Sequence, residues 1–68
     1  MNKKQTNALM AKINNLANAL EDVGIKCSIN EYTHFDNRRK CIEIETNHYV
    51  WGEQVCFCWY LDSGQRVY

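Results

Sequence analysis

The chain has 68 residues, and its eight Lys and Arg side chains balance eight Asp and Glu side chains. This length gives room for one domain over residues 1–68, because domains usually need at least about 50 residues. It excludes a nucleotide-binding α/β domain with a separate substrate domain. A formal net charge of zero also argues against a protein that is held mainly by nucleic-acid phosphates.

Residues 5–22 have the periodicity of an amphipathic helix of four to five turns. Polar residues, four of them Asn, occupy the other side of this helix, so packing must stabilise it more than helix propensity does. Gly24 stands where a left-handed residue commonly ends a helix. At 100° per residue, one stripe contains Thr6, Leu9, Met10, Ile13, Leu16, Ala17 and Leu20.

Apolar and polar residues alternate with a period of two after Gly24, over residues 25–32, 40–47 and 54–61. The connections between these segments are short and contain turn-forming residues, which predicts antiparallel hairpins. Residues 62–68 form a turn followed by a short edge strand or a tail. The fold class is therefore α+β, with one N-terminal helix packed on a three-stranded antiparallel sheet in the order α-β-β-β.

One helix covers one face of such a sheet, and the other face stays uncovered. The alternation places Lys26, Ser28, Asn30, Tyr32, Cys41, Glu43, Glu45, Asn47, Cys56, Cys58 and Tyr60 on the uncovered face. If the hairpins turn near residues 37 and 51, Tyr32 lies beside Cys41, Glu43 beside Tyr60, and Glu45 beside Cys58. A face that mixes thiols, aromatic rings and carboxylates is less polar than a solvated face, and such patches often mark an interface.

The cysteines provide no metal-binding pattern. Cys56 and Cys58 lie on one face of a strand about 7 Å apart, with Cys41 on the neighbouring strand. Zinc requires four converging Cys or His ligands, whereas Cys27 points into the core. We expect no metal and no cofactor, although free thiols, a disulfide and a metal site all remain open for Cys41, Cys56 and Cys58.

Catalysis has equally little support. His34, Cys41 and Glu43 could approach one another around the first hairpin, but no motif accompanies them, and a chain this short offers little concavity for a substrate. We therefore expect that the protein is not an enzyme.

Binding is the remaining class of function. The side chains that we expect to contact a partner are aromatic or cationic, the types that dominate interface energetics: Tyr32, Phe35, Arg38, Arg39, Trp51 and Tyr60. For Phe35 and Trp51, which lie in connections, the other interpretation is that they fold back and cap the small core. Replacing Arg39 or Trp51 by alanine should weaken binding and leave thermal stability nearly unchanged if these residues contact a partner.

We expect the partner to be another protein. Nucleic acid is the alternative, because Arg38, Arg39 and Lys40 form a basic cluster near aromatic side chains that could stack on bases. A homodimeric structural subunit is a further alternative, since either edge strand could pair with a second chain.

No apolar run is long enough for a secretory h-region or a membrane span. This pattern predicts a cytoplasmic protein without membrane contact, in which reduced thiols are expected. The small size and the Asn-, Lys- and Ile-rich composition resemble accessory proteins of bacteriophages and mobile elements. This resemblance implies an inhibitor that occupies the surface of a host enzyme or defence system.

Overall fold

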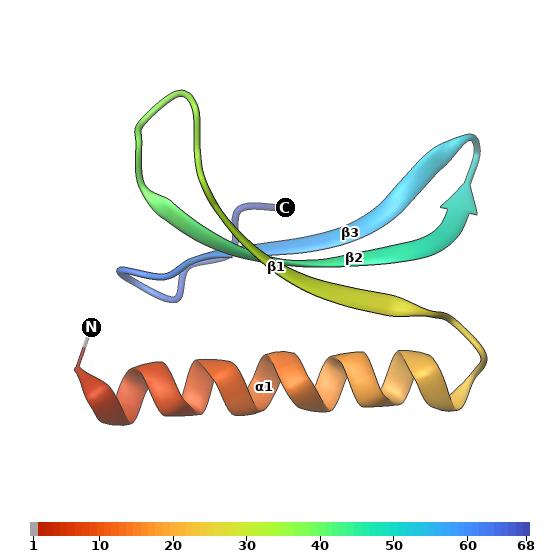
Figure 1. Cartoon of the computed structure of the whole chain (residues 1–68), viewed down its shortest axis with the longest axis horizontal. Coiled ribbons are helices and arrows are strands. Elements are labelled where there is room, and N and C mark those ends of the chain that lie inside the picture. The colour runs from red at the N-terminus through yellow and green to blue at the C-terminus, as the bar shows by residue number, and fades with distance from the viewer. Residues whose placement is uncertain (1) are drawn as a thin grey trace.

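The computed structural model describes residues 2–68. It contains one helix, α1 (Lys3–Asp22), followed by β1 (Cys27–Thr33), β2 (Lys40–Val50) and β3 (Glu53–Tyr60). The strands form one antiparallel sheet in the order β1-β2-β3, and α1 lies along one face of it (Figure 1). The predicted α+β fold and its order of elements are confirmed.

Helix α1 starts two residues earlier than the apolar stripe predicts, because Asn2 forms a capping box with Gln5. The Gln5 N–H donates to Asn2 Oδ1 at 2.9 Å, and the Asn2 N–H donates to Gln5 Oε1 at 3.0 Å. At the other end Gly24 has a φ of +87°, as its position predicts, and the Ile25 N–H donates to the Leu20 carbonyl at 3.0 Å. This Schellman turn ends the helix and directs the chain back toward the sheet.

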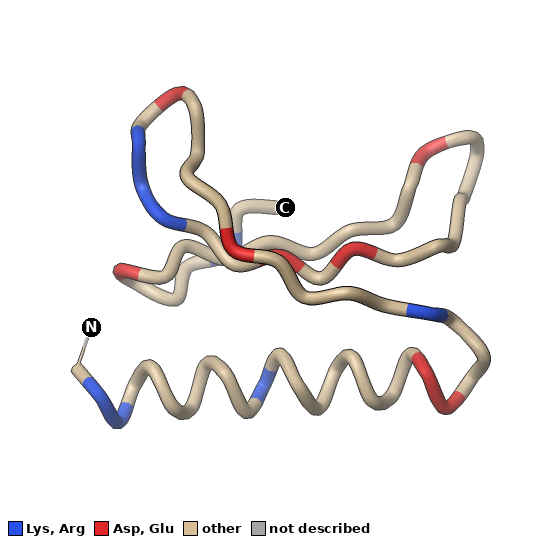
Figure 2. Tube along the Cα trace, in the orientation of Figure 1, with Lys and Arg blue, Asp and Glu red and all other residues tan. Residues whose placement is uncertain are grey.

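The charges of α1 oppose its dipole. Lys3 and Lys4 occupy the first turn, while Glu21 and Asp22 lie at the end of the helix, as Figure 2 shows. Both placements are unfavourable, because the N-terminus of a helix carries partial positive charge and the C-terminus partial negative charge. Packing of the apolar stripe therefore has to hold the helix.

The hydrophobic core lies between α1 and the face of the sheet that α1 covers. Three helix residues, spaced four apart, pack against side chains of β2 and β3. The most deeply buried side chains of this core have almost no exposed surface. The buried core consists of Leu9, Ile13, Ala17, Ile42, Ile44 and Trp59. Met10, Leu16, Leu20, Cys27, Phe57 and Leu61 pack around it and are partly buried.

The register of β1 against β2 agrees with the sequence prediction, since Tyr32 lies opposite Cys41. The register of β2 against β3 differs from it by two residues. The structure pairs Glu43 with Cys58 and Glu45 with Cys56, where the sequence predicts Tyr60 and Cys58.

A β-bulge in β2 causes this difference. Tyr49 still pairs with Gln54, as the position of the turn requires, but β2 residues 46–48 then stand opposite Val55 alone. The buried Thr46 hydroxyl donates to the Val55 carbonyl at 2.6 Å and so binds the bulged strand to β3. Because the shift is two residues, every side chain keeps the face that the alternation predicts.

Both hairpins bend away from α1, and the C-terminal segment lies between them on the far side of the sheet (Figure 1). This segment, residues 65–68, pairs with the edge of β3. The Tyr60 N–H donates to the Gln65 carbonyl at 2.8 Å, and the Val67 N–H donates to the Cys58 carbonyl at 2.7 Å. Of the two predicted forms, the structure therefore contains a short edge pairing, with one bridge between Trp59 and Arg66.

Candidate binding surface

The outer face, which we define as the sheet face opposite α1, is covered at its centre. Cys41 and Cys58 project onto it, yet both have no exposed surface. The Tyr68 side chain lies over this region and donates its hydroxyl hydrogen to the Glu43 carboxylate. The sequence prediction that Cys41 and Cys58 are uncovered is therefore wrong, because it does not return the C-terminal segment across the sheet.

Tyr32 belongs to the same cluster. Its hydroxyl lies 3.1 Å from Cys58 Sγ and 3.3 Å from the Tyr68 hydroxyl. The Cys58 N–H also donates to the Tyr68 carbonyl at 2.9 Å, which holds the C-terminal residue against β3. Tyr32, a candidate contact residue, is thus engaged within the protein.

The environment of this cluster favours neutral side chains. The hydrogen bond with Cys58 is the main cause that raises the pKa of Tyr32 to about 12, from 10.0. Burial is the main cause that raises the pKa of Tyr68, and the neighbouring Glu43 carboxylate adds to it. Burial also raises the pKa values of the Cys41 and Cys56 thiols above 9.0. Each shift disfavours an anion next to Glu43 or within the sheet.

We expect the free energy of unfolding to decrease as the pH rises from about 9 to about 12. A group whose pKa is higher in the folded protein than in the unfolded chain stabilises the fold. This stabilisation is complete below the pKa of the unfolded chain and is lost as the pH rises through the pKa of the folded protein. In the unfolded chain the pKa is 9.0 for the thiols and 10.0 for Tyr32, and in the folded protein the pKa of Tyr32 is about 12. Urea midpoints under reducing conditions at pH 7, 9, 10 and 11 measure this decrease.

Tyr32→Phe is the matched variant, because it removes the hydroxyl and keeps the ring. Its loss of stability between pH 10 and 11 should be smaller than that of the wild type. A wild-type urea midpoint that stays constant to pH 11 would contradict the assigned cluster.

Arg39 and Tyr60 are also engaged within the protein. The Arg39 guanidinium donates to both Asp62 carboxylate oxygens, at 2.6 and 2.8 Å, and lies 3.6 Å above the centre of the Tyr60 ring. The Tyr60 hydroxyl accepts from Asn37 Nδ2 at 3.0 Å. The hydrogen bonds from Arg39 lower the pKa of the Asp62 carboxyl. These contacts give Arg39 a structural role that does not require a partner.

The loop between β1 and β2 presents Phe35 and Arg38. Phe35 is 87% exposed, and its ring stacks on His34 at 5.7 Å with an interplanar angle of 2°. Arg38 is exposed and has a φ of +57°. Neither side chain caps the core, so this loop stays a candidate contact surface.

The hairpin tip, which we define as residues 49–52, is the other exposed apolar surface. Trp51 is 98% exposed, and Tyr49 and Val50 are exposed by 61% and 47%. Trp51 and Gly52 both have positive φ, at +55° and +78°, so they form a type I′ turn between Val50 and Glu53. Trp51 does not cap the core, which excludes one of the two sequence interpretations.

The backbone of Trp51 is the unusual feature of this tip. Type I′ turns favour Asn-Gly or Asp-Gly, because most residues with a Cβ atom have a cost of about 1 kcal/mol or more in the left-handed region. An exposed Trp recovers none of this cost through packing. The dipeptide Trp51-Gly52 in a two-residue connection is a signal that sequence reasoning could have used.

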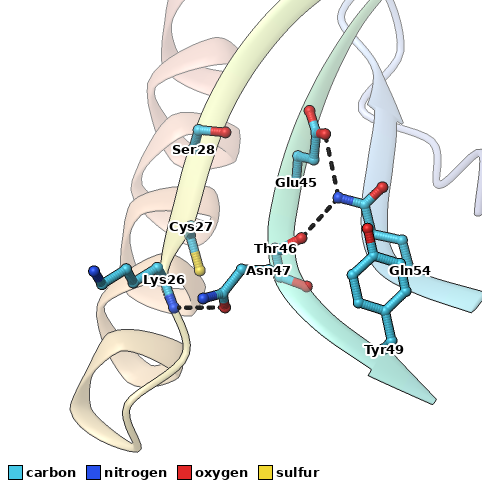
Figure 3. Close-up of a pocket in the computed structure, with 8 residues that line it drawn as sticks. All are labelled: Lys26, Cys27, Ser28, Glu45, Thr46, Asn47, Tyr49 and Gln54. Atoms are coloured by element: carbon cyan, nitrogen blue, oxygen red, sulfur yellow. Dashed lines mark hydrogen bonds between the residues drawn. The ribbon is translucent and has the colours of Figure 1, made fainter.

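A shallow hollow of about 470 Å³ lies beside the tip, where β1 separates from β2 (Figure 3). Its walls are held by hydrogen bonds: Gln54 Nε2 donates to the Thr46 carbonyl at 2.7 Å and to Glu45 at 3.2 Å. The Lys26 N–H donates to Asn47 Oδ1 at 3.2 Å. The lining consists of Lys26, Cys27, Ser28, Glu45, Thr46, Asn47, Tyr49 and Gln54.

The four cysteines are free thiols. Among residues 2–68, no three His, Cys, Asp or Glu side chains are placed to hold a metal ion. The one described helix is not long and apolar enough to span a membrane. No protein family model, no curated protein and no solved structure matches the chain.

Proposed function

We propose that the protein is a small binding module that attaches to another protein through its hairpin tip. The observation that supports this proposal most directly is Trp51, which is almost fully exposed in a backbone conformation that disfavours it. Side chains kept in unfavourable conformations tend to be found at functional sites. Trp is also the residue type most enriched among those that dominate binding energy.

The surroundings of Trp51 favour a protein over a nucleic acid. Tyr49 and Val50 extend the apolar surface, and residues 48–56 contain no Lys or Arg that could bind phosphates. At the opposite hairpin, one of the three consecutive cations, Arg39, is already neutralised by Asp62. The contact therefore combines apolar burial with aromatic packing, as in protein interfaces.

Replacing Trp51 by asparagine is expected to stabilise the fold and weaken binding. Asparagine tolerates the left-handed conformation, so the free energy of unfolding should rise by about 0.5–1 kcal/mol, and Tm by about 4 °C. Loss of an aromatic anchor should raise the Kd for the partner about 30-fold. Thermal unfolding measures the first effect, and capture from nuclease-treated bacterial lysate followed by titration of the captured protein measures the second.

Phe35→Asn is the matched control, because it removes an exposed aromatic ring from the opposite hairpin. It should retain the captured protein. Capture that Trp51→Asn retains and Phe35→Asn loses would place the contact at the other hairpin. Capture that disappears with nuclease would support the nucleic-acid alternative, with Phe35, Arg38 and Lys40 as its contacts.

The homodimer alternative predicts twice the monomer mass by light scattering at micromolar concentration and no captured protein. A single captured enzyme or defence protein would instead identify the target of an inhibitor. Enzymatic assays of that target with wild-type protein and Trp51→Asn would then separate inhibition from simple attachment.

A further inference from the structure

Strand β2 is longer than its neighbour β1. The last pair between them is Cys27 with Thr46, and one more backbone hydrogen bond joins the Asn47 N–H to the Lys26 carbonyl at 3.1 Å. β1 begins at Cys27, and the connection before it leads back to α1, while β2 continues past Asn47 to Val50. The end of β2 therefore pairs with β3 on one side and has no strand on the other.

The backbone of Tyr49 faces this free side. Val50 pairs with Glu53 across the two-residue turn, so its N–H and carbonyl point to β3. Backbone groups alternate in direction along a strand, so those of Tyr49 point the other way. The Asn47 N–H, two residues before, points to β1 and agrees with this direction. Tyr49, which lines the hollow, therefore presents one backbone donor and one backbone acceptor to it.

Parts of both outer edges of the sheet carry protection that this site lacks. On β1, Glu31 lies opposite Ile42 and so places a charge on the face toward α1, a feature that discourages pairing with another chain. On β3, the C-terminal segment pairs with Cys58 and Tyr60. At the hairpin tip, the side chains beside the free backbone are instead aromatic or apolar.

One charged side chain, Glu45, lines the wall of the hollow. The Glu45 carboxylate accepts from both Asn30 and Gln54, at 3.3 and 3.2 Å. The Lys26 side chain points away from the hollow, and only its backbone N–H faces Asn47 (Figure 3). An occupant therefore meets the Glu45 carboxylate on one wall and the exposed side chains of Tyr49 and Val50 at the hairpin tip.

We propose that the hollow beside β2 receives an extended segment of the partner protein, which adds to β2 as a short strand in line with β1. This inference rests on the proposed function and names the chemistry of the contact. Strand addition uses main-chain hydrogen bonds for affinity and alternate side chains for specificity. The segment carries β-branched or aromatic residues beside the exposed Val50 and Trp51.

The probe is a displayed library of random octapeptides, selected on the wild-type protein and counter-selected on Tyr49→Pro. Proline at this position removes the N–H that faces the hollow and leaves the bonds to β3 intact. The enriched peptide should contain alternating apolar residues. When the peptide saturates the protein, the Tyr49 amide should exchange its hydrogen about tenfold more slowly, as one added hydrogen bond predicts.

An analogue of the peptide, N-methylated at the residue opposite Tyr49, keeps the test independent of how well Tyr49→Pro folds. It should bind about tenfold more weakly than the parent peptide.

Selection of no peptide, or binding that leaves the exchange of the Tyr49 amide unchanged, would overturn strand addition. If the Tyr49 amide exchanges more slowly at higher protein concentration without peptide, the occupant of the hollow is a second copy of the chain. That result would also overturn the addition of a partner strand. A partner that requires Trp51 and leaves Tyr49 unprotected would contradict strand addition only. A partner that Trp51→Asn still captures with unchanged affinity would contradict the proposed function itself.

Discussion

Replacing Ile13 by alanine is expected to decrease the free energy of unfolding by about 3 kcal/mol. Ile13 has no exposed surface, and it lies at the centre of the apolar stripe against β2 and β3. A domain of this size seldom has more than about 3–5 kcal/mol of net stability. The variant should therefore keep at most about 2 kcal/mol and unfold partly at 37 °C.

Urea unfolding followed by circular dichroism measures this loss. Asn14→Ala is the matched control, because Asn14 is the exposed neighbour on the same helix and alanine is the better helix former. Its stability should equal or slightly exceed that of the wild type. A loss below about 1 kcal/mol for Ile13→Ala would mean that α1 contributes less to the core than its burial indicates.

Tyr68→Ala is expected to expose thiols that are otherwise inaccessible. In the wild type, Cys41 and Cys58 have no exposed surface, so alkylation requires an opening reaction that approaches global unfolding. With about 3–5 kcal/mol of stability, these thiols should react at least about a hundredfold more slowly than in the unfolded chain. Removing the ring that covers the outer face should abolish most of this protection at Cys58.

Alkylation by iodoacetamide, read site by site by mass spectrometry of peptides, measures the rates. Cys27 and Cys56, which are partly exposed, provide internal standards, and Tyr49→Ala is the control at an exposed tyrosine. If Cys58 is alkylated at the same rate in the wild type and in Tyr68→Ala, Tyr68 does not cover it. Faster alkylation of Cys58 in Tyr49→Ala would also contradict this assignment of Tyr68.

Local patterns were sufficient to predict the fold. The stripe through Leu9, Ile13 and Ala17 defined the helix, and alternation defined the strands and the faces of their side chains. The bulge in β2 could not be predicted, since it depends on the Thr46 hydroxyl finding the Val55 carbonyl across the sheet. The earlier helix start could have been predicted from Asn2 and Gln5, which have capping-box spacing.

The candidate contact residues fall into two groups, those bonded within the protein and those left exposed. The bonded group has partners 23 to 36 positions away in the sequence, such as Asp62 and Tyr68, which no periodicity reveals; it consists of Tyr32, Arg39 and Tyr60. Phe35, Arg38 and Trp51 remain exposed. Whether an aromatic side chain in a connection folds inward depends on the turn, and the turn type at Trp51 directs its side chain to solvent.

The bulge in β2 has a consequence for how this protein can vary during evolution. Residues 46–48 absorb two extra positions, an even number, so the hairpin beyond them keeps its alternation with the rest of the sheet. Insertions or deletions of two residues here would enlarge or remove the bulge and leave the core residues in place. A single-residue change would turn the apolar side chains of one strand segment outward. Relatives of this protein should therefore differ in this hairpin by pairs of residues.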